Sequence, residues 1–267
     1  MQAASLLYHD VVPTGEPEIS GFSGAVANRY KLTREVFEDH LRAITTCPQQ
    51  RCATASEILS GEIDDACPCL LTFDDGGVSA LTEIANRLEA LAWRGHFFIT
   101  TDRIGQPGFL SAEQIRELHQ RGHIIGTHSC SHPRRIDQLD ESELRREWSQ
   151  SSAVLADILK TPIWCGSVPG GFFSRRVALA AQHAGLKLLF TSEPTCRWSQ
   201  AGTLRIAGRL PIVNQTPASL AATLAAGDRW TILRQQCVWN GKKFAKSVAG
   251  DFYRQVSEWL FRQRQPA

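Results

Sequence analysis

The chain has 267 residues, enough for one large α/β domain or two small ones. Its 29 basic and 27 acidic residues leave a formal net charge of +2, which argues against a nucleic-acid binder held by a basic patch. No run of 18 or more apolar residues is present, so no membrane span is expected. The N-terminus lacks the basic and apolar regions of a signal peptide, and we therefore expect a cytoplasmic protein.

Apolar runs alternate with helically spaced segments along the chain. Strands are expected at 5–9, 69–73, 96–100, 123–127, 163–168, 186–191 and 208–213. Helices are expected at 32–44, 79–93, 111–121, 140–159 and 174–184, with two or three more after residue 213. Thr33, Ser111 and Asp140 are the expected N-caps, and Gly95 is expected to close the second of these helices.

This alternation predicts βα units and a parallel sheet whose two faces are both buried. Seven strands favour a distorted barrel over an open sheet. We expect a single domain over 1–267, with its core motifs between 5 and 213 and with C-terminal helices (214–267) that pack on the barrel. Polar residues follow several strand ends, which is where barrel enzymes place their active sites.

Two adjacent carboxylates, Asp74 and Asp75, follow the apolar strand 69–73 and precede Gly76 and Gly77. A turn that begins there can bring both carboxylates into one mouth, and the glycines permit the tight backbone that such a turn requires. For an isolated Asp-Asp-Gly, a solvated turn with a helix-capping aspartate is the more common explanation. The apolar strand before the pair and the histidines that follow later weaken that explanation.

His128 and His132 follow the strand 123–127, and Pro133 comes directly after them. Two imidazoles four residues apart can face one metal ion, although two unrelated surface histidines would give the same pattern. Together with Asp75 they would form a site of two nitrogens and one oxygen with open positions. Asp74 would stay unligated nearby, where it can act as general base.

The combination of TFDDG (72–76) with HSxxH (128–132) resembles the polysaccharide deacetylase (NodB-homology) family, the fourth family of carbohydrate esterases. The resemblance extends from Tyr8-His9-Asp10 to the segment around Glu193. It implies a distorted (β/α)7 barrel. It also implies one divalent metal on Asp75, His128 and His132, with zinc preferred over Co, Mn, Ni or Fe, and Asp74 as the base.

The chain departs from the usual family pattern in three places. The segment 167–171 lacks the arginine that usually accompanies this motif, so the partner that orients Asp74 stays open. No aromatic-rich fourth motif is evident, and the C-terminal segment 210–214 has no histidine to act as general acid. Some relatives with a permuted order supply that histidine from an N-terminal Tyr-His-Asp segment. His9 fits that role, with a hydrogen-bonded core histidine as the alternative.

Other residues after strand ends are candidates for substrate binding. Backbone N–H groups near Pro169, Gly170 and Gly171 can stabilise an oxyanion, and Phe172 either stacks on a sugar ring or belongs to the core. Glu193 follows another strand end. The remaining residues have structural explanations that need no ligand. We expect His40 on the surface of a helix, and Arg209 can point inward from a strand. Apolar sides of helices account for the tryptophans Trp148, Trp230, Trp239 and Trp259.

These observations predict an enzyme that hydrolyses the N-acetyl amide of an amino sugar, with a metal-held water as nucleophile, Asp74 as base and His9 as acid. A cytoplasmic location favours a nucleotide- or lipid-linked saccharide precursor as substrate, with no nucleic-acid partner. Two alternatives remain open: hydrolysis of a non-sugar amide or cyclic imide on the same fold, and an inactive glycan-binding domain. The sequence does not indicate the oligomeric state.

Overall fold

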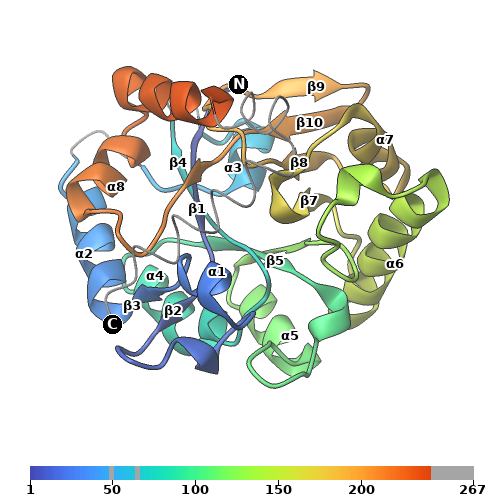
Figure 1. Cartoon of the computed structure of the whole chain (residues 1–267), viewed down its shortest axis with the longest axis horizontal. Helices are drawn as coiled ribbons and strands as arrows, with labels where there is room; N and C mark the ends of the chain where they lie inside the picture. The colour runs from blue at the N-terminus through green and yellow to red at the C-terminus, as the bar shows by residue number, and fades with distance from the viewer. Residues whose placement is uncertain (48–50, 64–66, 242–267) are drawn as a thin grey trace.

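The central sheet of the computed structural model, which describes residues 1–47, 51–63 and 67–241, contains nine strands (Figure 1). Their order is β11-β1-β4-β5-β6-β7-β8-β10-β9, and every neighbouring pair is parallel except β10 with β9. The strands are β1 (Ala4–Tyr8), β4 (Cys69–Phe73), β5 (Gly95–Ile99), β6 (Ile124–Thr127), β7 (Cys165–Ser167), β8 (Leu188–Phe190), β9 (Ser199–Ala201), β10 (Leu204–Ala207) and β11 (Leu210–Pro211).

The sheet curls so that β11, at one end, and β10, the strand next to the other end, are joined by a single short stretch of chain. β10 pairs with β8, β11 pairs with β1, and only Gly208 and Arg209 separate β10 from β11. The expected seventh strand at 208–213 is only partly observed: β11 lies within that range, and β10 precedes it. The prediction of a distorted α/β barrel is confirmed.

Helices surround this sheet on the outside (Figure 1). They are α2 (Arg34–Thr45), α3 (Ala55–Ser60), the π-helical segment η2 (Ala80–Ala85) continued by α4 (Asn86–Glu89), α5 (Ala112–Gln120), α6 (Glu141–Leu159), α7 (Arg175–His183) and α8 (Ala218–Ala225). Residues 229–241 are also helical. The segment between β1 and α2 holds the short pair β2 (Val11–Val12) and β3 (Leu32–Thr33), together with α1 (Ala25–Asn28).

The predicted N-caps are confirmed, because Thr33, Ser111 and Asp140 each accept a hydrogen bond from a backbone N–H in the first turn of their helix. Gly95 does not close a helix as predicted. It is the first residue of β5, and the left-handed Ala92 (φ 57°) stands where the preceding helix ends. A glycine is needed in β5 because a Cβ at position 95 would lie 3.0 Å from Leu88 and 3.1 Å from Phe73.

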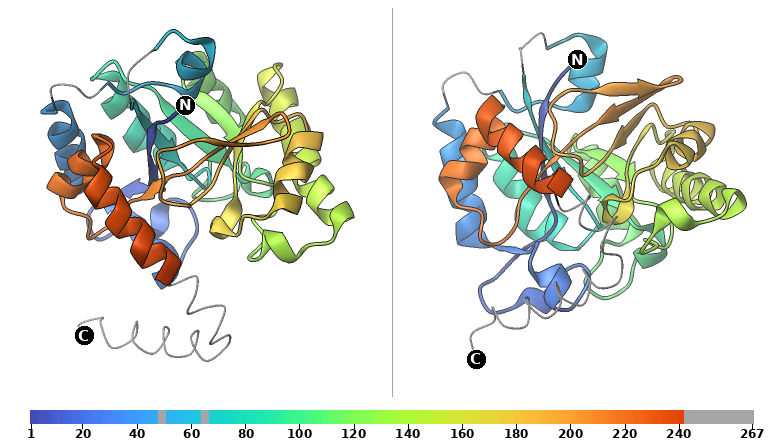
Figure 2. Two further views of the ribbon diagram at one scale, coloured as in Figure 1. Left: turned by 90° about the horizontal axis from the view of Figure 1, so that it is seen from above. Right: turned by 45° about the horizontal axis from the view of Figure 1, so that its top comes forward.

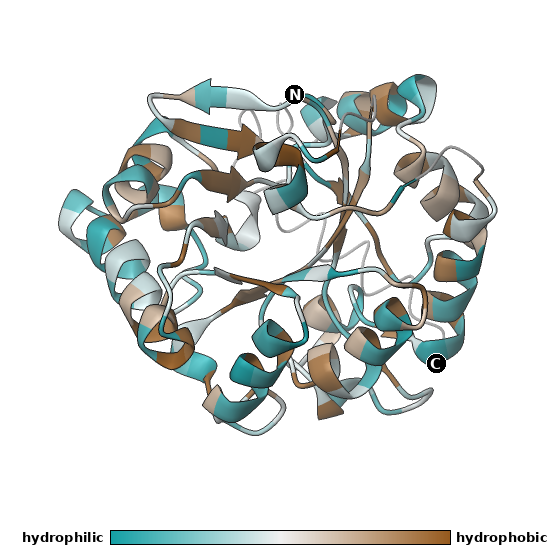
Figure 3. Ribbon diagram, turned by 180° about the vertical axis from the view of Figure 1, so that it is seen from behind, coloured by the Kyte–Doolittle hydropathy of each residue, from teal (hydrophilic) through white to brown (hydrophobic). Residues whose placement is uncertain are grey.

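The core lies between the strands and the helices, and Figure 3 shows hydrophobic residues along the central strands and a mixture of polar and hydrophobic residues along the helices. Trp148 on α6 is fully buried, in line with its predicted position. The prediction for His40 was wrong: it is fully buried, and it contacts the Tyr8 hydroxyl (3.2 Å) and the Thr216 carbonyl (2.8 Å). Trp230 was also predicted wrongly, since 76% of it is exposed.

The C-terminal part of the prediction is described only in part. α8 packs against α2 and β1. Residues 242–267, including Trp259, lie outside the described residues. Among the described helices, none is long and apolar enough to cross a bilayer.

Candidate active site

Asp74 and Asp75 stand at the C-terminal end of β4, where the chain turns sharply. Asp75 (φ 76°) and Gly76 (φ 83°) both adopt the left-handed conformation, which is strained for an aspartate. This reversal lets two consecutive carboxylates reach the same end of the barrel instead of opposite faces of a strand. Such strain is tolerated where the surrounding structure determines the conformation, and it is often found at functional sites.

Asp10 holds this turn from the side. Its Oδ1 accepts hydrogen bonds from the hydroxyls of Ser20 (2.6 Å) and Ser79 (2.7 Å). A Cβ at Gly77 would lie 2.0 Å from the same oxygen, so only glycine fits there. Asp10 therefore shapes the turn.

The loop after β6 carries the two histidines. Ser129 (φ 66°) and His132 (φ 56°) are left-handed, so the loop is tightly wound. The buried carboxylate of Glu147, on α6, accepts hydrogen bonds at 2.9 Å from the backbone N–H groups of Cys130 and Ser131. It also accepts one from the Ser131 hydroxyl at 2.9 Å. Glu147 thus fixes the chain between the two histidines.

Asp75, His128 and His132 converge on one point. Their ligand atoms all lie within 4.8 Å of one another, and Asp75 Oδ1 is 3.5 Å from Nε2 of each histidine. His128 Nδ1 lies 2.9 Å from the Ser167 carbonyl, which can only accept, so Nδ1 carries the proton and Nε2 keeps its lone pair. Burial lowers the pKa of His128 to about 3, so the ring is neutral, as a metal ligand must be.

Arg209 is the residue that orients the carboxylate of Asp74. Its guanidinium donates to both carboxylate oxygens of Asp74, at 2.7 and 2.8 Å, in the planar two-pronged geometry that suits this pair. Its remaining donors reach the Ser167 hydroxyl (2.7 Å), the Thr72 hydroxyl (3.3 Å) and the Thr191 carbonyl (3.1 Å). Arg209 is fully buried, and every one of these bonds ends inside the barrel.

The two neighbouring carboxylates differ sharply in their electrostatics. Burial alone would raise the pKa of Asp74, but the positive charge of Arg209 outweighs it and the pKa is lowered. Burial also acts on Asp75, and the negative charges of Asp74 and Asp10 add to its effect, so the pKa of Asp75 rises to about 7. A cation bound beside Asp75 would remove this penalty. Arg209 therefore favours the ionised form of Asp74, whereas no lysine or arginine among the described residues forms an ion pair with Asp75.

His9 follows β1 at the same end of the barrel. Its ring centroid is 4.7 Å from that of Tyr30, and its buried Nδ1 has no hydrogen-bond partner among the described residues. An electrostatic contribution from His9 lowers the pKa of both Asp74 and Asp75. It is not paired with Asp10, whose side chain is engaged by Ser20 and Ser79.

The remaining predicted residues form part of the rim. Pro169 is buried, and Gly170 (φ 61°) and Gly171 (φ 72°) continue a 3-10 turn after β7. Phe172 is partly buried against the core, and the Cζ atom of Arg135 lies 4.4 Å from the centroid of its ring. Glu193 is exposed. An aromatic residue at this rim was missed: a Cβ at Gly171 would lie 3.5 Å from the ring of Trp239.

Comparisons with known proteins agree with this geometry. Residues 64–189 match the sequence model of the polysaccharide deacetylase family. YxkH of Bacillus subtilis (strain 168), a candidate polysaccharide deacetylase, is 23% identical over 189 residues, which cover 68% of this chain and 66% of that protein. The chain thus spans just under two thirds of the length of this curated relative.

Solved structures give the same result for the fold. The Streptococcus pyogenes deacetylase PplD, in complex with acetate, superposes with a TM-score of 0.70 at 18% identity, covering 84% of this chain and 98% of that one. IcaB from Ammonifex degensii superposes with a TM-score of 0.69 at 21% identity, covering 84% and 97%. The chain is therefore similar in fold to the polysaccharide deacetylases. The resemblance inferred from the two motifs is confirmed, and it supports an enzyme of the deacetylase class.

Several residues of the site lie outside the segment that matches the family, among them His9, Glu193 and Arg209. Arg209 is the main residue that sequence reasoning left without a role. The signal that could have found it is a lone arginine in a segment predicted to be a buried strand, since a buried charge requires a partner.

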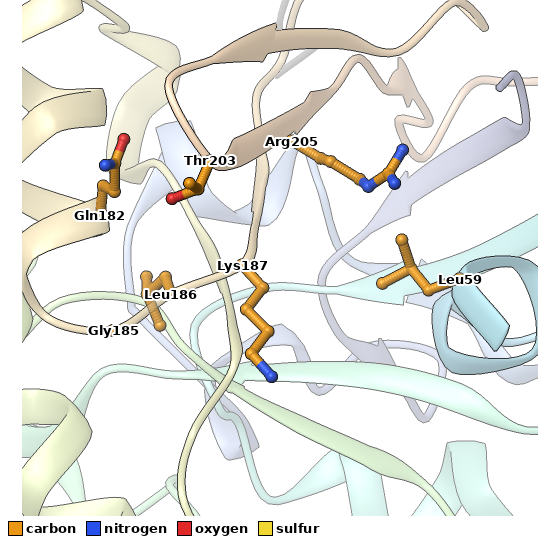
Figure 4. Close-up of a pocket in the computed structure, with 7 residues that line it drawn as sticks. All are labelled: Leu59, Gln182, Gly185, Leu186, Lys187, Thr203 and Arg205. Atoms are coloured by element: carbon orange, nitrogen blue, oxygen red, sulfur yellow. The ribbon is translucent and has the colours of Figure 1, made fainter.

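A separate pocket lies at the opposite ends of the strands (Figure 4). Lys187, Thr203 and Arg205 line it, and they precede β8 or open β10, whereas the site residues follow strand ends. It contains none of the residues of the Asp-His-His cluster. We therefore place the chemistry at the C-terminal ends of the strands.

Proposed function

We propose that the protein is a metal-dependent hydrolase that removes the acetyl group from an N-acetylated amino sugar in a glycan or glycan precursor. The observation that carries this proposal is the arrangement around Asp74. Three side chains with metal-ligand chemistry converge beside Asp74, a second carboxylate that is bound by Arg209 and whose Oδ2 lies 3.8 Å from Nε2 of His128.

The residues present fit a divalent cation. Asp75, His128 and His132 offer one oxygen and two nitrogens, a set that suits Zn²⁺ best and also Co, Mn, Ni or Fe. His128 is already held in the required tautomer by the Ser167 carbonyl. When bound, the cation would polarise the amide carbonyl and raise the acidity of the attacking water.

The proton transfers fall to this chain's own residues. Asp74 would accept the proton of the attacking water, and Arg209 and Ser167 hold its carboxylate in position. Because its pKa is lowered, Asp74 is a weak base that can accept a proton only from a nucleophile more acidic than bulk water. His9 would then donate a proton to the departing amine, and backbone N–H groups near Gly170 and Gly171 would stabilise the oxyanion.

Two alternatives make different predictions. A hydrolase of a non-sugar amide or cyclic imide would use the same centre, and only a substrate panel separates it from a sugar deacetylase. An inactive glycan-binding domain would have no need for an ionised base held by a buried arginine, and this arrangement argues against it. A nucleotide- or lipid-linked saccharide remains the substrate form that we propose.

The test is release of acetate from a panel of N-acetylated sugars and non-sugar amides, with elemental analysis of the same sample. Asp74→Asn should keep the metal and lose about 10²–10⁴ in rate. The exposed Asp157→Asn, on the far surface, is the matched control and should behave as the wild type. Acetate release by Asp74→Asn at the wild-type rate would contradict the assignment of the base.

A further inference from the structure

The helix at 229–241 exposes a hydrophobic face to solvent. Trp230, Leu233 and Val238 are exposed by 76%, 47% and 58%, and they are three of the nine large hydrophobic residues that stand out from the surface of the described chain. Cys237 on the same side is also exposed. Residues 230, 233 and 237 are spaced by three and four, so they form one stripe along the helix.

This exposure does not come from a helix that is loosely attached. Ile232, on the opposite side, is 7% exposed and belongs to the hydrophobic core. Trp239 on that side reaches the rim of the active site at Gly171. Figure 2 shows the helix (red) along the edge of the molecule. The helix is thus anchored by one face and leaves the apolar stripe uncovered.

The C-terminal part of the chain, which begins with this helix, carries the excess of positive over negative charge. Residues 229–267 hold eight basic and two acidic residues, whereas residues 1–228 hold 21 basic and 25 acidic ones. The C-terminal segment therefore has a net charge of +6 on a chain whose remainder is −4. Arg229 and Arg234 are exposed beside the apolar stripe, so charge and hydrophobicity share one face.

We propose that this face, made of Trp230, Leu233, Cys237 and Val238 with Arg229 and Arg234, is a docking surface for an anionic lipid membrane. Interfacial helices of this kind insert apolar side chains at the level of the headgroups while basic side chains bind anionic lipids. Tryptophan is the residue most suited to that boundary, because its ring is apolar and its N–H can be hydrogen-bonded. A nucleic acid would account for the charge but would leave Leu233 and Val238 unexplained.

Docking would also orient the enzyme. Because the same helix contacts the rim through Trp239, a membrane bound to its outer face would lie close to the mouth of the barrel. Under the function proposed above, this would favour a substrate carried by a lipid.

Sedimentation of the full chain with vesicles tests the surface. We expect binding to vesicles of phosphatidylcholine mixed with phosphatidylglycerol, weaker binding at high salt, and little binding to phosphatidylcholine alone. The double variant Trp230→Ser, Leu233→Ser should bind the anionic vesicles at least about tenfold more weakly, since both apolar contacts are lost. Leu179→Ser is the matched control, because Leu179 is 41% exposed on α7, away from this helix.

Three results would overturn the proposal: no binding to the anionic vesicles, equal binding by the double variant, or loss of a dimer instead of loss of lipid binding. Arg229→Glu with Arg234→Glu should also weaken vesicle binding, which gives a second variant that leaves the apolar stripe intact. The test is independent of catalysis, because Asp74→Asn should bind vesicles as the wild type does, whether or not the protein proves to be a deacetylase.

Discussion

Replacing Arg209 with methionine would test the central electrostatic contact of the site. Methionine has a similar length but no charge and no donors. The substitution removes five hydrogen bonds: two to the carboxylate of Asp74 and one each to Ser167, Thr72 and Thr191. It also leaves Asp74 as a buried carboxylate without a cation.

Removing one partner of a buried ion pair costs about 3–5 kcal/mol. For a domain of this size, each kcal/mol lowers Tm by about 2–4 °C, so we expect a decrease of about 6–20 °C. Loss of an oriented base should lower kcat by about 10²–10⁴. The base must be ionised to act, so activity is present above its pKa. Because Arg209 lowers the pKa of Asp74, its removal should move the acidic limb of the pH–rate profile to higher pH.

Thermal unfolding and kcat measured across pH provide the readout. Arg209→Lys keeps the charge but loses the planar two-pronged contact, so it should recover part of the stability and less of the rate. Arg176→Met on the exposed side of α7 controls for the loss of an arginine as such. If Arg209→Met unfolded within about 2 °C of the wild type and kept its pH profile, Arg209 would not be the partner of the base.

Three further variants examine the other parts of the site. His128→Ala should lose metal and activity together, and full metal occupancy by elemental analysis would disprove the ligand assignment. His9→Ala should keep the metal while kcat for an amide falls by about 10²–10⁴, with a smaller loss for an activated acetate ester that needs no protonation of its leaving group. Equal losses on both substrates would exclude His9 as the acid. Glu147→Gln should weaken metal binding by about 10–100-fold, because the loop between the histidines loses its charged acceptor. An unchanged dissociation constant in metal titration would show that Glu147 is not needed to position the loop.

Local signals were sufficient for most of the fold. Strands buried on both faces are near-continuous apolar runs, and a side-chain cap is decided within four residues, so β4 and the N-termini of α2, α5 and α6 were predicted correctly. The Asp-His-His cluster was predicted for a related reason. Its members follow strand ends, and parallel strands bring those ends together.

What the sequence did not reveal depends on contacts between distant residues. Arg209 and Asp74 are 135 residues apart, and nothing near either residue indicates the other. His40 was misplaced because its surroundings come from β1 and from Thr216. Trp230 was misplaced because helical spacing shows which residues share a face but not whether anything covers that face.

Gly208 and Arg209, the two residues between β10 and β11, form the seam at which the barrel closes. Through Arg209, this seam also contributes to the candidate active site. Gly208 lets the chain pass between two partner strands, and Arg209, the next residue, turns inward to the base. A protein trimmed to the segment that matches the family, 64–189, would contain Asp74, Asp75, His128 and His132 but would lack the seam, β1 and Arg209. The part of the chain needed for the proposed chemistry therefore extends beyond the motifs in both directions. A fusion or library that contained only residues 64–189 would have both motifs but no closed barrel.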